Sequence, residues 1–495
     1  MFKIIIKKSI LVFSIIFILN NINAQTQLGG DIDGEAVNNS SGWAVSMPNA
    51  TTVAIGAPSN DEVASGAGHV RVFSWNGTSW IQKGSDVDGQ YAFDELGTVV
   101  SMPDENTFGA GEPGNAQSVN PFGRIKIYSW NGSSWIQKGS TLNGLSAGER
   151  FGFALSMGDN NTFAVGSIGG STWTLNPSGK VIIYEWNGAD WVQKGNTIVG
   201  EASGDQFGYT VSMPNSNTVA ISAPFNDGSF NNAGHVRIFE WNGSSWVQKG
   251  NDIDGEAAGD NSGWSIDMPD SNTIAIGAPK NAGGIYLNGH TRIYSWNGTS
   301  WVQKGVDING TNVGENLGFS VSMPDANNIA IGAPYNGTNN TNSGKVVIYS
   351  WNGTQWVQNG NNIYGEAQDD ESGKAICMPD VNTVAVGSHR NSGNGNDAGH
   401  VRIFEITPTL GVNEYESELI VNAYPNPTNE NFTIDLGKEY DTIQLTIRNI
   451  LGQEVYNKNY KSSRFLDLQL TEENGIYFIE IVSNDKSVIL KIIKK

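Results

Sequence analysis

A unit of about 55 residues repeats along most of this chain, and this repeat constrains the fold more than any other sequence feature. The triplet Trp-Asn-Gly recurs at intervals of 55 or 56 residues, beginning at Trp75, Trp130, Trp186, Trp241, Trp296 and Trp351. A methionine, usually followed by proline, recurs with the same period at Met47, Met102, Met157, Met213, Met268, Met323 and Met378. The second series has seven members and the first has six, so one unit lacks the segment that carries the triplet.

Each unit has the pattern of four short β-strands. In the fourth unit these are residues 207–213, 218–223, 235–241 and 246–249, which alternate polar with apolar residues or are rich in β-branched ones. An Asn-Gly pair at 242–243 joins the last two strands, and this pair is a strong signal for a tight hairpin. The pattern therefore predicts an all-β fold without helices.

Seven units of four strands predict a seven-bladed β-propeller over residues 25–405, because radial repetition hides the edges of small sheets. The last unit ends after 401–405 without a fourth strand. Residues 27–35 (QLGGDIDGE) match 248–256 (QKGNDIDGE), which end the fourth strand of another unit. We therefore expect the N-terminal segment to supply the missing strand and to close the ring.

The two ends of the chain differ from the repeat. Residues 1–24 combine a basic start, an apolar stretch at 10–19 and a small residue at Ala24, as a secretory signal peptide does. Residues 406–418 interrupt the repeat and are expected to be a linker. From residue 419 onward, alternating strands without tryptophan predict a separate immunoglobulin-like β-sandwich.

Composition limits the partners of the mature protein. The formal net charge is −20, which disfavours binding to nucleic acid and favours cations or basic partners. No stretch after the signal peptide is long and apolar enough for a transmembrane helix. The single cysteine, Cys377, excludes an internal disulfide framework. We expect a secreted or cell-surface monomer.

The repeat resembles the FG-GAP propellers of integrin α-chain heads. The resemblance rests on Phe207-Gly208 at the first strand, on Gly277-Ala278-Pro279 after the second and on Gly234 before the third. It implies the propeller fold but no particular activity. Calcium-binding members carry a D-x-D-x-D-G loop between the first two strands, whereas residues 269–272 form only a short turn here. We therefore expect no calcium at the family's site and no cofactor.

The C-terminal part resembles the type A sorting domain of the type IX secretion system. The resemblance rests on motifs in the family's order: Tyr424-Pro425-Asn426-Pro427, residues 432–434, Leu451-Gly452-Gln453-Glu454-Val455 and Gly475-Ile476-Tyr477-Phe478. It implies export across an outer membrane by the type IX machinery, followed by release or by attachment to the cell surface. Tyr424, Pro425, Asn426, Pro427, Gly452, Gly475 and Tyr477 are the sorting-motif residues that it implies.

Acidic residues recur three positions before the glycine that opens each unit, and we call this set the acidic rim. Its members are Asp94, Glu149, Asp205, Asp260, Glu315 and Asp370, with Asn39 in the first unit. Such a rim offers oxygen ligands to a cation such as calcium. Short carboxylates that cap backbone N–H groups in the turns between blades explain it more simply, and we favour that interpretation.

No constellation for catalysis stands out. His69, His235, His290 and His400 occupy a position that carries Arg124, Lys180 and Lys345 in the other units, so we expect solvated strand residues rather than ligands or bases. His389 is alone in a loop. Cys377 replaces a serine of the repeat and is expected to be buried filler. Asp267 and Lys374 also replace the usual inner-strand residue, without forming an obvious pair.

Binding is the function that we expect. The loops between second and third strands differ from unit to unit and carry the aromatics Trp173, Phe225, Phe230, Tyr286 and Tyr335. They share a face with the blade-to-blade loops, and we expect a glycan or protein ligand there. The Trp pairs of the W-N-G-x-x-W hairpins form either a sugar-stacking array or, as we favour, a structural clamp. The alternatives are a polysaccharide-active enzyme and a structural surface-layer component.

Overall fold

The computed structural model describes residues 25–114, 121–169, 178–282, 286–406, 421–483 and 486–495. They belong to two compact units that divide between Thr409 and Leu410. The predicted signal peptide lies outside the described residues, as does most of the predicted linker. Ile406, expected to begin that linker, is instead buried and donates its backbone N–H to the Asn382 carbonyl at 2.6 Å. The propeller therefore includes Ile406.

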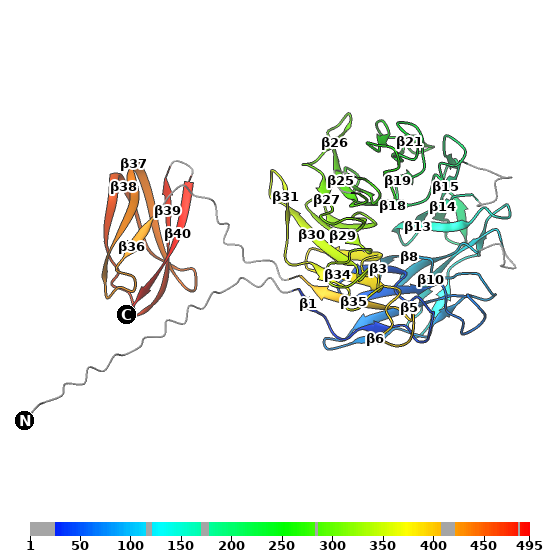
Figure 1. Cartoon of the computed structure of the whole chain (residues 1–495), viewed down its shortest axis with the longest axis horizontal. Helices are drawn as coiled ribbons and strands as arrows, with labels where there is room; N and C mark the ends of the chain where they lie inside the picture. Colours follow the sequence, from blue (N-terminus) through cyan, green and yellow to red (C-terminus); the bar gives the residue numbers. More distant parts are fainter. Residues whose placement is uncertain (1–24, 115–120, 170–177, 283–285, 407–420, 484–485) are drawn as a thin grey trace, which may run out of the picture. The chain divides into compact units, whose positions relative to one another are not determined.

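Seven antiparallel sheets form the first unit (Figure 1). In six of them the strands follow one another in chain order, and in the seventh the two N-terminal strands join the last three strands of the propeller. The innermost strands are β3 (Ala44–Asn49), β8 (Val99–Asp104), β13 (Phe151–Asp159), β18 (Val211–Asn215), β23 (Ser265–Asp270), β28 (Ser320–Asp325) and β33 (Ala375–Asp380). The second strands are β4 (Thr52–Ala57), β9 (Thr107–Glu112), β14 (Thr162–Ser167), β19 (Thr218–Ala223), β24 (Thr273–Ala278), β29 (Asn328–Ala333) and β34 (Thr383–Ser388). The third strands are β5 (His69–Trp75), β10 (Arg124–Trp130), β15 (Lys180–Trp186), β20 (His235–Trp241), β25 (His290–Trp296), β30 (Lys345–Trp351) and β35 (His400–Glu405).

The outer strand of each blade is split into two pieces, and both pieces pair with the third strand. The first pieces are β6 (Trp80–Gln82), β11 (Trp135–Gln137), β16 (Trp191–Gln193), β21 (Trp246–Gln248), β26 (Trp301–Gln303), β31 (Trp356–Gln358) and, in the seventh blade, β1 (Thr26–Gln27). The second pieces are β7 (Val87–Asp88), β12 (Leu142–Asn143), β17 (Ile198–Val199), β22 (Ile253–Asp254), β27 (Ile308–Asn309), β32 (Ile363–Tyr364) and, in the seventh blade, β2 (Ile32–Asp33).

The N-terminal segment closes the ring by completing the seventh blade. Strand β1 pairs antiparallel with β35, with Thr26 opposite Glu405, and β2 pairs with the same strand, with Ile32 opposite Val401. The seventh sheet thus combines the first and the last strands of the propeller, so its third strand has no open edge. This is the pairing that the match between residues 27–35 and 248–256 predicts.

The propeller core lies between neighbouring blades, and the sheets are covered on both faces. Ile183 of the third blade and Ile221 of the fourth belong to the same apolar cluster, as does Trp246 of the outer hairpin. All six residues of β19 are buried, and so are the first five residues of β20. Because each sheet packs between two others, a polar side chain on either face of a third strand is removed from solvent.

The tryptophan hairpins fasten six of the seven blades to the preceding blade. Trp246 donates its Nε1–H to the Lys194 carbonyl at 2.9 Å, and the Lys194 ammonium lies 5.5 Å from the ring centre of Trp241. The rings of Trp241 and Trp246 are 5.5 Å apart. The other hairpins repeat this arrangement, with indole bonds from Trp80, Trp135, Trp191, Trp301 and Trp356 to the preceding segment. The ring faces that a sugar array needs are therefore occupied in part by lysine.

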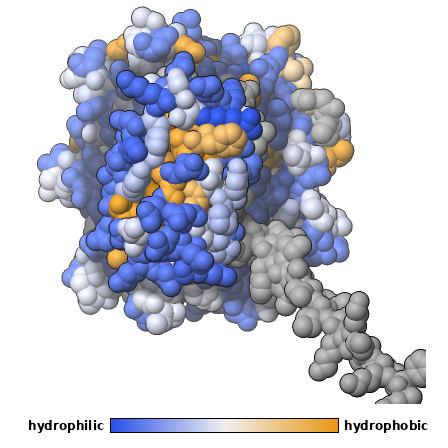
Figure 2. Space-filling view, turned by 90° about the vertical axis from the view of Figure 1, so that its left-hand side faces the viewer, coloured by the Kyte–Doolittle hydropathy of each residue, from blue (hydrophilic) through white to orange (hydrophobic). Residues whose placement is uncertain are grey.

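The C-terminal unit is a small β-sandwich with its own core. Its strands are β36 (Asn422–Tyr424), β37 (Asn431–Asn449), β38 (Glu454–Gln469), β39 (Gly475–Ser483) and β40 (Lys486–Lys494), in the order β36-β37-β39-β40 with β38 paired to β37. Figure 2 shows a face that is largely hydrophilic, with one larger central hydrophobic patch and several smaller ones. Among the described residues, no helix has the length and apolar character needed to cross a membrane.

Candidate functional site

One side chain from each blade lies at the mouth of the central channel. Each of these residues directly follows the glycine that opens its blade, and we call them the mouth ring. Its members are Trp43, Thr98, Phe153, Tyr209, Trp264, Phe319 and Lys374. The backbone requires glycine at the position before Phe319. Gly318 has a φ of +88°, and a Cβ there would lie 2.4 Å from the His290 carbonyl oxygen.

All seven residues of the mouth ring line one cavity of about 630 Å³. Pro58 and Ser59, from a loop between second and third strands, also line it, as do Glu95 and Arg150 from blade-to-blade loops. The cavity therefore lies on the face where both loop sets meet, at the start of the innermost strands. A concave site with mixed apolar and polar walls is the usual form of a small-ligand site.

The aromatic members of the mouth ring form a continuous arc. The ring centres of Phe153 and Tyr209 lie 5.2 Å apart, those of Tyr209 and Trp264 5.0 Å, and those of Trp264 and Phe319 5.5 Å. The Lys374 ammonium follows, 5.6 Å from the ring centre of Phe319. Ring contacts at these distances are favourable and orient the faces of the side chains.

Two cations belong to this cavity. The guanidinium of Arg150 lies 4.8 Å from the ring centre of Phe153, and no ion-pair partner of Arg150 lies among the residues that the structure describes. Lys374 Nζ is 3.9 Å from Glu371, and burial lowers the pKa of the Lys374 ammonium. Glu371 is shared, because Arg390 also approaches it at 3.0 Å. The chain is strongly acidic overall, so a cationic mouth is a local feature.

The predicted loop aromatics divide into three groups. Phe225 lies 6.2 Å from Tyr209, and Tyr335 lies 5.9 Å from Phe319, so both extend the arc of the mouth ring. Phe230 and Tyr286 are exposed, and neither lines the mouth cavity. Trp173 lies outside the described residues. The structure thus brings two of the five candidates to one place.

The mouth ring itself was missed by reasoning from the sequence, which singled out only Lys374. A signal existed: the residue after the opening glycine is aromatic in five of the seven units. Its meaning depends on the radial arrangement, because seven residues spaced by 55 positions meet only when the ring closes.

Below the mouth, a second ring ties the innermost strands together. Its members are Ser46, Ser101, Ser156, Ser212, Asp267, Ser322 and Cys377, and each accepts the backbone N–H of a methionine in the next blade. Asp267 accepts from Met323 at 2.7 Å, and the surrounding protein raises the pKa of this carboxyl to about 6. Burial raises the pKa of the Cys377 thiol to about 12, so this thiol is a poor nucleophile.

The acidic rim is buried and engaged by donors of the protein itself. Asp260 accepts hydrogen bonds from the Ala257 backbone N–H at 2.9 Å and from the Asn281 amide at 3.0 Å. Glu149, Asp205, Glu315 and Asp370 likewise accept backbone N–H groups of the preceding turn, and Asp94 accepts from Tyr91. Among the described residues, no rim carboxylate belongs to a group of potential ligands close enough to share one metal ion.

The expectation of solvated histidines is wrong. His69, His235, His290 and His400 are at most 1% exposed. They begin third strands, and both faces of these strands are covered by neighbouring blades, so a polar residue in an alternating strand is not on a wet surface. His389 is also buried, against Trp43 at 5.0 Å between ring centres, and burial lowers its pKa to about 3.

The sorting-motif residues shape the turns of the C-terminal unit. Asn426 donates to the Lys491 carbonyl at 2.7 Å and accepts from the Ile493 backbone N–H at 3.0 Å. Gly452 occupies a turn with a φ of +78°, and the Tyr477 hydroxyl donates to the Glu473 carbonyl at 2.7 Å. Tyr424 is half exposed. Large exposed apolar side chains of this unit are Ile450, Leu451, Phe465, Ile476, Phe478 and Ile489.

Comparison with known families identifies the C-terminal unit. A family model described as a secretion system C-terminal sorting domain matches residues 422–495. This unit is a type IX sorting domain, and the chain is therefore exported to the cell surface or secreted. The protein is thus a seven-bladed β-propeller that carries a C-terminal export domain.

No curated protein matches the chain. Similar solved structures include the β-propeller domain of the Trilobed protease from Pyrococcus furiosus, at 9% identity and a TM-score of 0.41, over 74% of this chain and 96% of that one. Another is the GH74 xyloglucanase from Xanthomonas campestris, at 10% identity and a TM-score of 0.35, over 94% of this chain and 84% of that one. At such TM-scores these likenesses carry no argument about activity.

Proposed function

We propose that this protein is a non-catalytic binding propeller of the cell surface or the extracellular medium, and that its ligand is a glycan held in the mouth cavity. The observation that carries the proposal is the mouth ring, to which every blade contributes one residue and five blades contribute an aromatic one. Aromatic faces arranged in an arc suit the apolar faces of sugar rings, and hydroxyl, amine and guanidinium groups beside them suit sugar oxygens.

The charges of the cavity favour an acidic glycan. Arg150 and Lys374 line it together with a single carboxylate, Glu95. A cation with few competing carboxylates, in a partly dehydrated pocket, binds a carboxylate or sulfate group more strongly than it does at an open surface. The same proposal includes three further points: the propeller is related to the FG-GAP propellers, it acts in adhesion, and it has no catalytic activity.

The ionisable groups of the cavity support binding rather than catalysis. General acid–base chemistry on a glycoside needs two carboxyl groups that flank one bond. Glu95 is the one carboxylate among the lining residues, and Asp267 lies in the second ring, where it accepts the Met323 N–H.

The test is binding of the full-length mature chain to a glycan array that holds neutral, uronate-containing and sulfated oligosaccharides. We expect binding to acidic members, and we expect Trp264→Ala to weaken it at least about 10-fold, or about 1.4 kcal/mol. Tyr286→Ala is the matched control, because this aromatic is exposed and does not line the cavity. Binding that survives Trp264→Ala but is lost with Tyr286→Ala would contradict the mouth cavity as the site.

A further inference from the structure

The position that begins the third strand divides the seven blades into two kinds. In four blades it is a buried histidine, and these histidine blades are marked by His69, His235, His290 and His400. In the other three blades it is a cation, namely Arg124, Lys180 or Lys345. The backbone is the same in both kinds, so the difference lies in what the side chains do.

Two further positions change together with the histidine. The residue 17 positions later is Asp86, Asp252 or Asp307 in histidine blades, and ring closure places Asp31 there in the seventh. It is Thr141, Thr197 or Asn362 in the other blades. The residue after the glycine that precedes the blade is Glu35, Glu201, Glu256 or Glu366 in histidine blades, and Gln90, Leu145 or Thr311 elsewhere. Positions that vary together act as one set.

The three positions meet in space in the first, fourth and fifth blades, whereas in the seventh blade the third member of the group at His400 is Asp33 rather than Glu366. His69 Nδ1 lies 3.5 Å from Asp86 Oδ2 and 3.8 Å from Glu35 Oε2. The corresponding histidine-to-aspartate distances are 3.5 Å for His235, 3.8 Å for His290 and 3.5 Å for His400. These separations are long for hydrogen bonds. They suit ligands of one small cation, because donor atoms about 2.0–2.2 Å from Zn²⁺ lie about 3.3–3.6 Å from each other.

Neighbouring side chains orient the carboxylates toward the histidine. Gln82 donates to Asp86 Oδ1 at 2.5 Å, which leaves Oδ2 facing His69. Arg71 approaches Glu35 Oε1 at 3.4 Å, which leaves Oε2 on the same side. In the other histidine blades the glutamine bond recurs with Asp252, Asp307 and Asp31. Support of this kind is typical of groups around a metal ligand set.

The histidines lack partners of their own. Both ring nitrogens of His69 and His400 are buried without a hydrogen-bond partner, and so is Nε2 of His235 and His290. Each of these buried imidazoles therefore lacks the hydrogen-bond partners that buried polar groups normally have.

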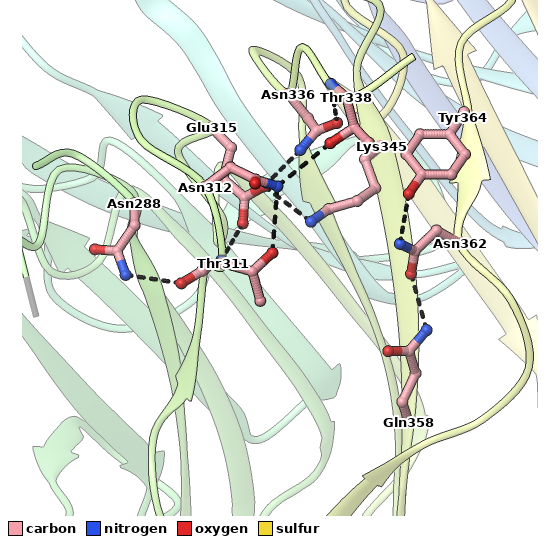
Figure 3. Close-up of polar contacts among 11 residues, drawn as sticks. Asn288, Thr311, Asn312, Glu315, Asn336, Thr338, Lys345, Gln358, Asn362 and Tyr364 are labelled. Atoms are coloured by element: carbon pink, nitrogen blue, oxygen red, sulfur yellow. Dashed lines mark hydrogen bonds and ion pairs between the residues drawn. The ribbon is translucent and has the colours of Figure 1, made fainter. Parts of the chain in front are cut away.

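In the three other blades the residue at the histidine position is a cation that pairs with a carboxylate of the acidic rim. Lys345 Nζ lies 2.9 Å from Glu315, and Lys180 Nζ lies 2.6 Å from Glu149 (Figure 3 shows the former). Asn362 takes the place of the aspartate there and still accepts from its glutamine, Gln358, at 2.8 Å (Figure 3). Histidine blades also have a guanidinium nearby, since Arg71, Arg237, Arg292 and Arg402 lie 3.2–3.4 Å from Glu35, Glu201, Glu256 and Glu366. The two kinds of blade thus differ in the residue that begins the third strand, which is a cation in one kind and a histidine beside carboxylates in the other.

We propose that each histidine blade binds one divalent transition-metal ion of the Zn²⁺ type through histidine Nδ1, the aspartate and a second carboxylate. That second carboxylate is Glu35, Glu201 or Glu256, and Asp33 in the seventh blade, and Glu62 is a further potential ligand in the first blade. One nitrogen and two oxygen donors suit such ions better than Ca²⁺, which prefers oxygen alone. Partly exposed carboxylates leave positions open to water.

The ions would fasten the ring. Glu35 follows β2 of the seventh blade, whereas His69 begins β5 of the first blade, so one ion spans the junction between first and last blades. At His400 the ligands Asp31 and Asp33 come from the N-terminal segment that closes the ring. These sites are independent of the glycan proposed for the mouth cavity.

The test starts from the full-length chain after removal of metals with a chelator. Titration with Zn²⁺ by calorimetry should give four ions per chain, Co²⁺ should give the visible absorption of a nitrogen-and-oxygen site, and Ca²⁺ should not displace either ion. Zn²⁺ should also raise the midpoint of thermal unfolding. Zn²⁺ that fails to bind would overturn the proposal.

A stricter test uses a variant in which a histidine blade receives the residues found at the same positions in a blade without histidine. His235→Lys with Asp252→Thr copies the third blade, so its fold is expected to survive and its stoichiometry to fall from four to three. Asp252→Asn keeps the shape and serves as the second variant, with the same loss. Thr197→Ser in the third blade is the control and should leave four ions. An unchanged stoichiometry in both variants would place the ions elsewhere and refute these sites.

Discussion

The ammonium nitrogen of Lys374 lies 4.2 Å from the ring centre of Trp43, across the junction between the last blade and the first. This contact places a cation against an aromatic face inside the mouth cavity. It brings together two positions that are far apart in the sequence.

Replacing this cation should change which glycans bind. Lys374→Met keeps the length of the side chain and removes its charge, so affinity for acidic oligosaccharides should fall about 10-fold while affinity for neutral ones stays within about 2-fold. Titration calorimetry of the full-length chain measures both. Lys280→Met is the control, since Lys280 is exposed and its ammonium lies 5.7 Å from the ring centre of Trp264. Equal losses for both glycan classes would argue against a charge-based role.

Asp267 makes the stability of the propeller dependent on pH. Its pKa is raised from 3.8 to about 6 by burial, so the folded state holds the proton more tightly than the unfolded state. The free energy of unfolding therefore falls as pH rises from about 4 to about 6 and levels off above. Asp267→Ser restores the usual residue of the second ring and should stabilise the protein by about 2–3 kcal/mol at pH 7.5 and by about 1 kcal/mol at pH 4.5.

Denaturant unfolding followed by tryptophan fluorescence checks this prediction, because all tryptophans precede the C-terminal unit. Ser322→Asp is the reverse change at an equivalent position and should destabilise the chain more at pH 7.5 than at pH 4.5. A stability gain for Asp267→Ser that is the same at both pH values would rule out the buried charge as its cause.

The contribution of the N-terminal strand to the free energy of unfolding can be measured by comparing two residues at equivalent positions. Ile32 in β2 and Ile308 in β27 are both 5% exposed. If the N-terminal strand is docked as firmly as an internal one, Ile32→Ala and Ile308→Ala should each lower the free energy of unfolding by about 2–4 kcal/mol. A negligible loss for Ile32→Ala beside a full loss for Ile308→Ala would show that the seventh blade is not closed in solution.

The lysine-tryptophan fastening between blades depends on a glycine. Gly250 has a φ of +77°, and a Cβ there would lie 2.6 Å from the ring of Trp296. Gly243 has a φ of +98° and open space around its Cβ position. Gly243→Ala should therefore cost about 1 kcal/mol through the backbone alone, and Gly250→Ala about 2–3 kcal/mol because the indole must also move. Equal costs in denaturant unfolding would mean that the indole is not held in place.

Local pattern was enough for much of the architecture. Hairpin turns such as Asn242-Gly243 and alternation in segments such as 207–213 depend on neighbours in sequence, so they can be recognised without tertiary structure. The closing strand was predictable for a related reason, because residues 27–35 copy a segment whose place in the unit is known. The sorting motifs are likewise short and contiguous.

The binding candidates were predictable only in part. The loop aromatics Phe225 and Tyr335 were found because their loops vary, and variation is visible in the sequence. Phe153 and Trp264 were not found, since each lies inside a regular strand-opening pattern and becomes part of a cavity only beside its counterparts in other blades.

The repeat, its seven-fold count and its strand order thus follow from the chain's own local chemistry, since turns and strand alternation are short-range properties. Which side chains are buried, and which residues come together in one site, is decided by how the blades pack against each other. His69 looks like a solvated strand residue until a neighbouring blade covers its face, and Asp86 becomes its partner only when the outer strand folds back along β5. The mouth ring likewise exists only once seven sheets meet around one axis, because long-range proximity is set by ring geometry rather than by spacing along the chain.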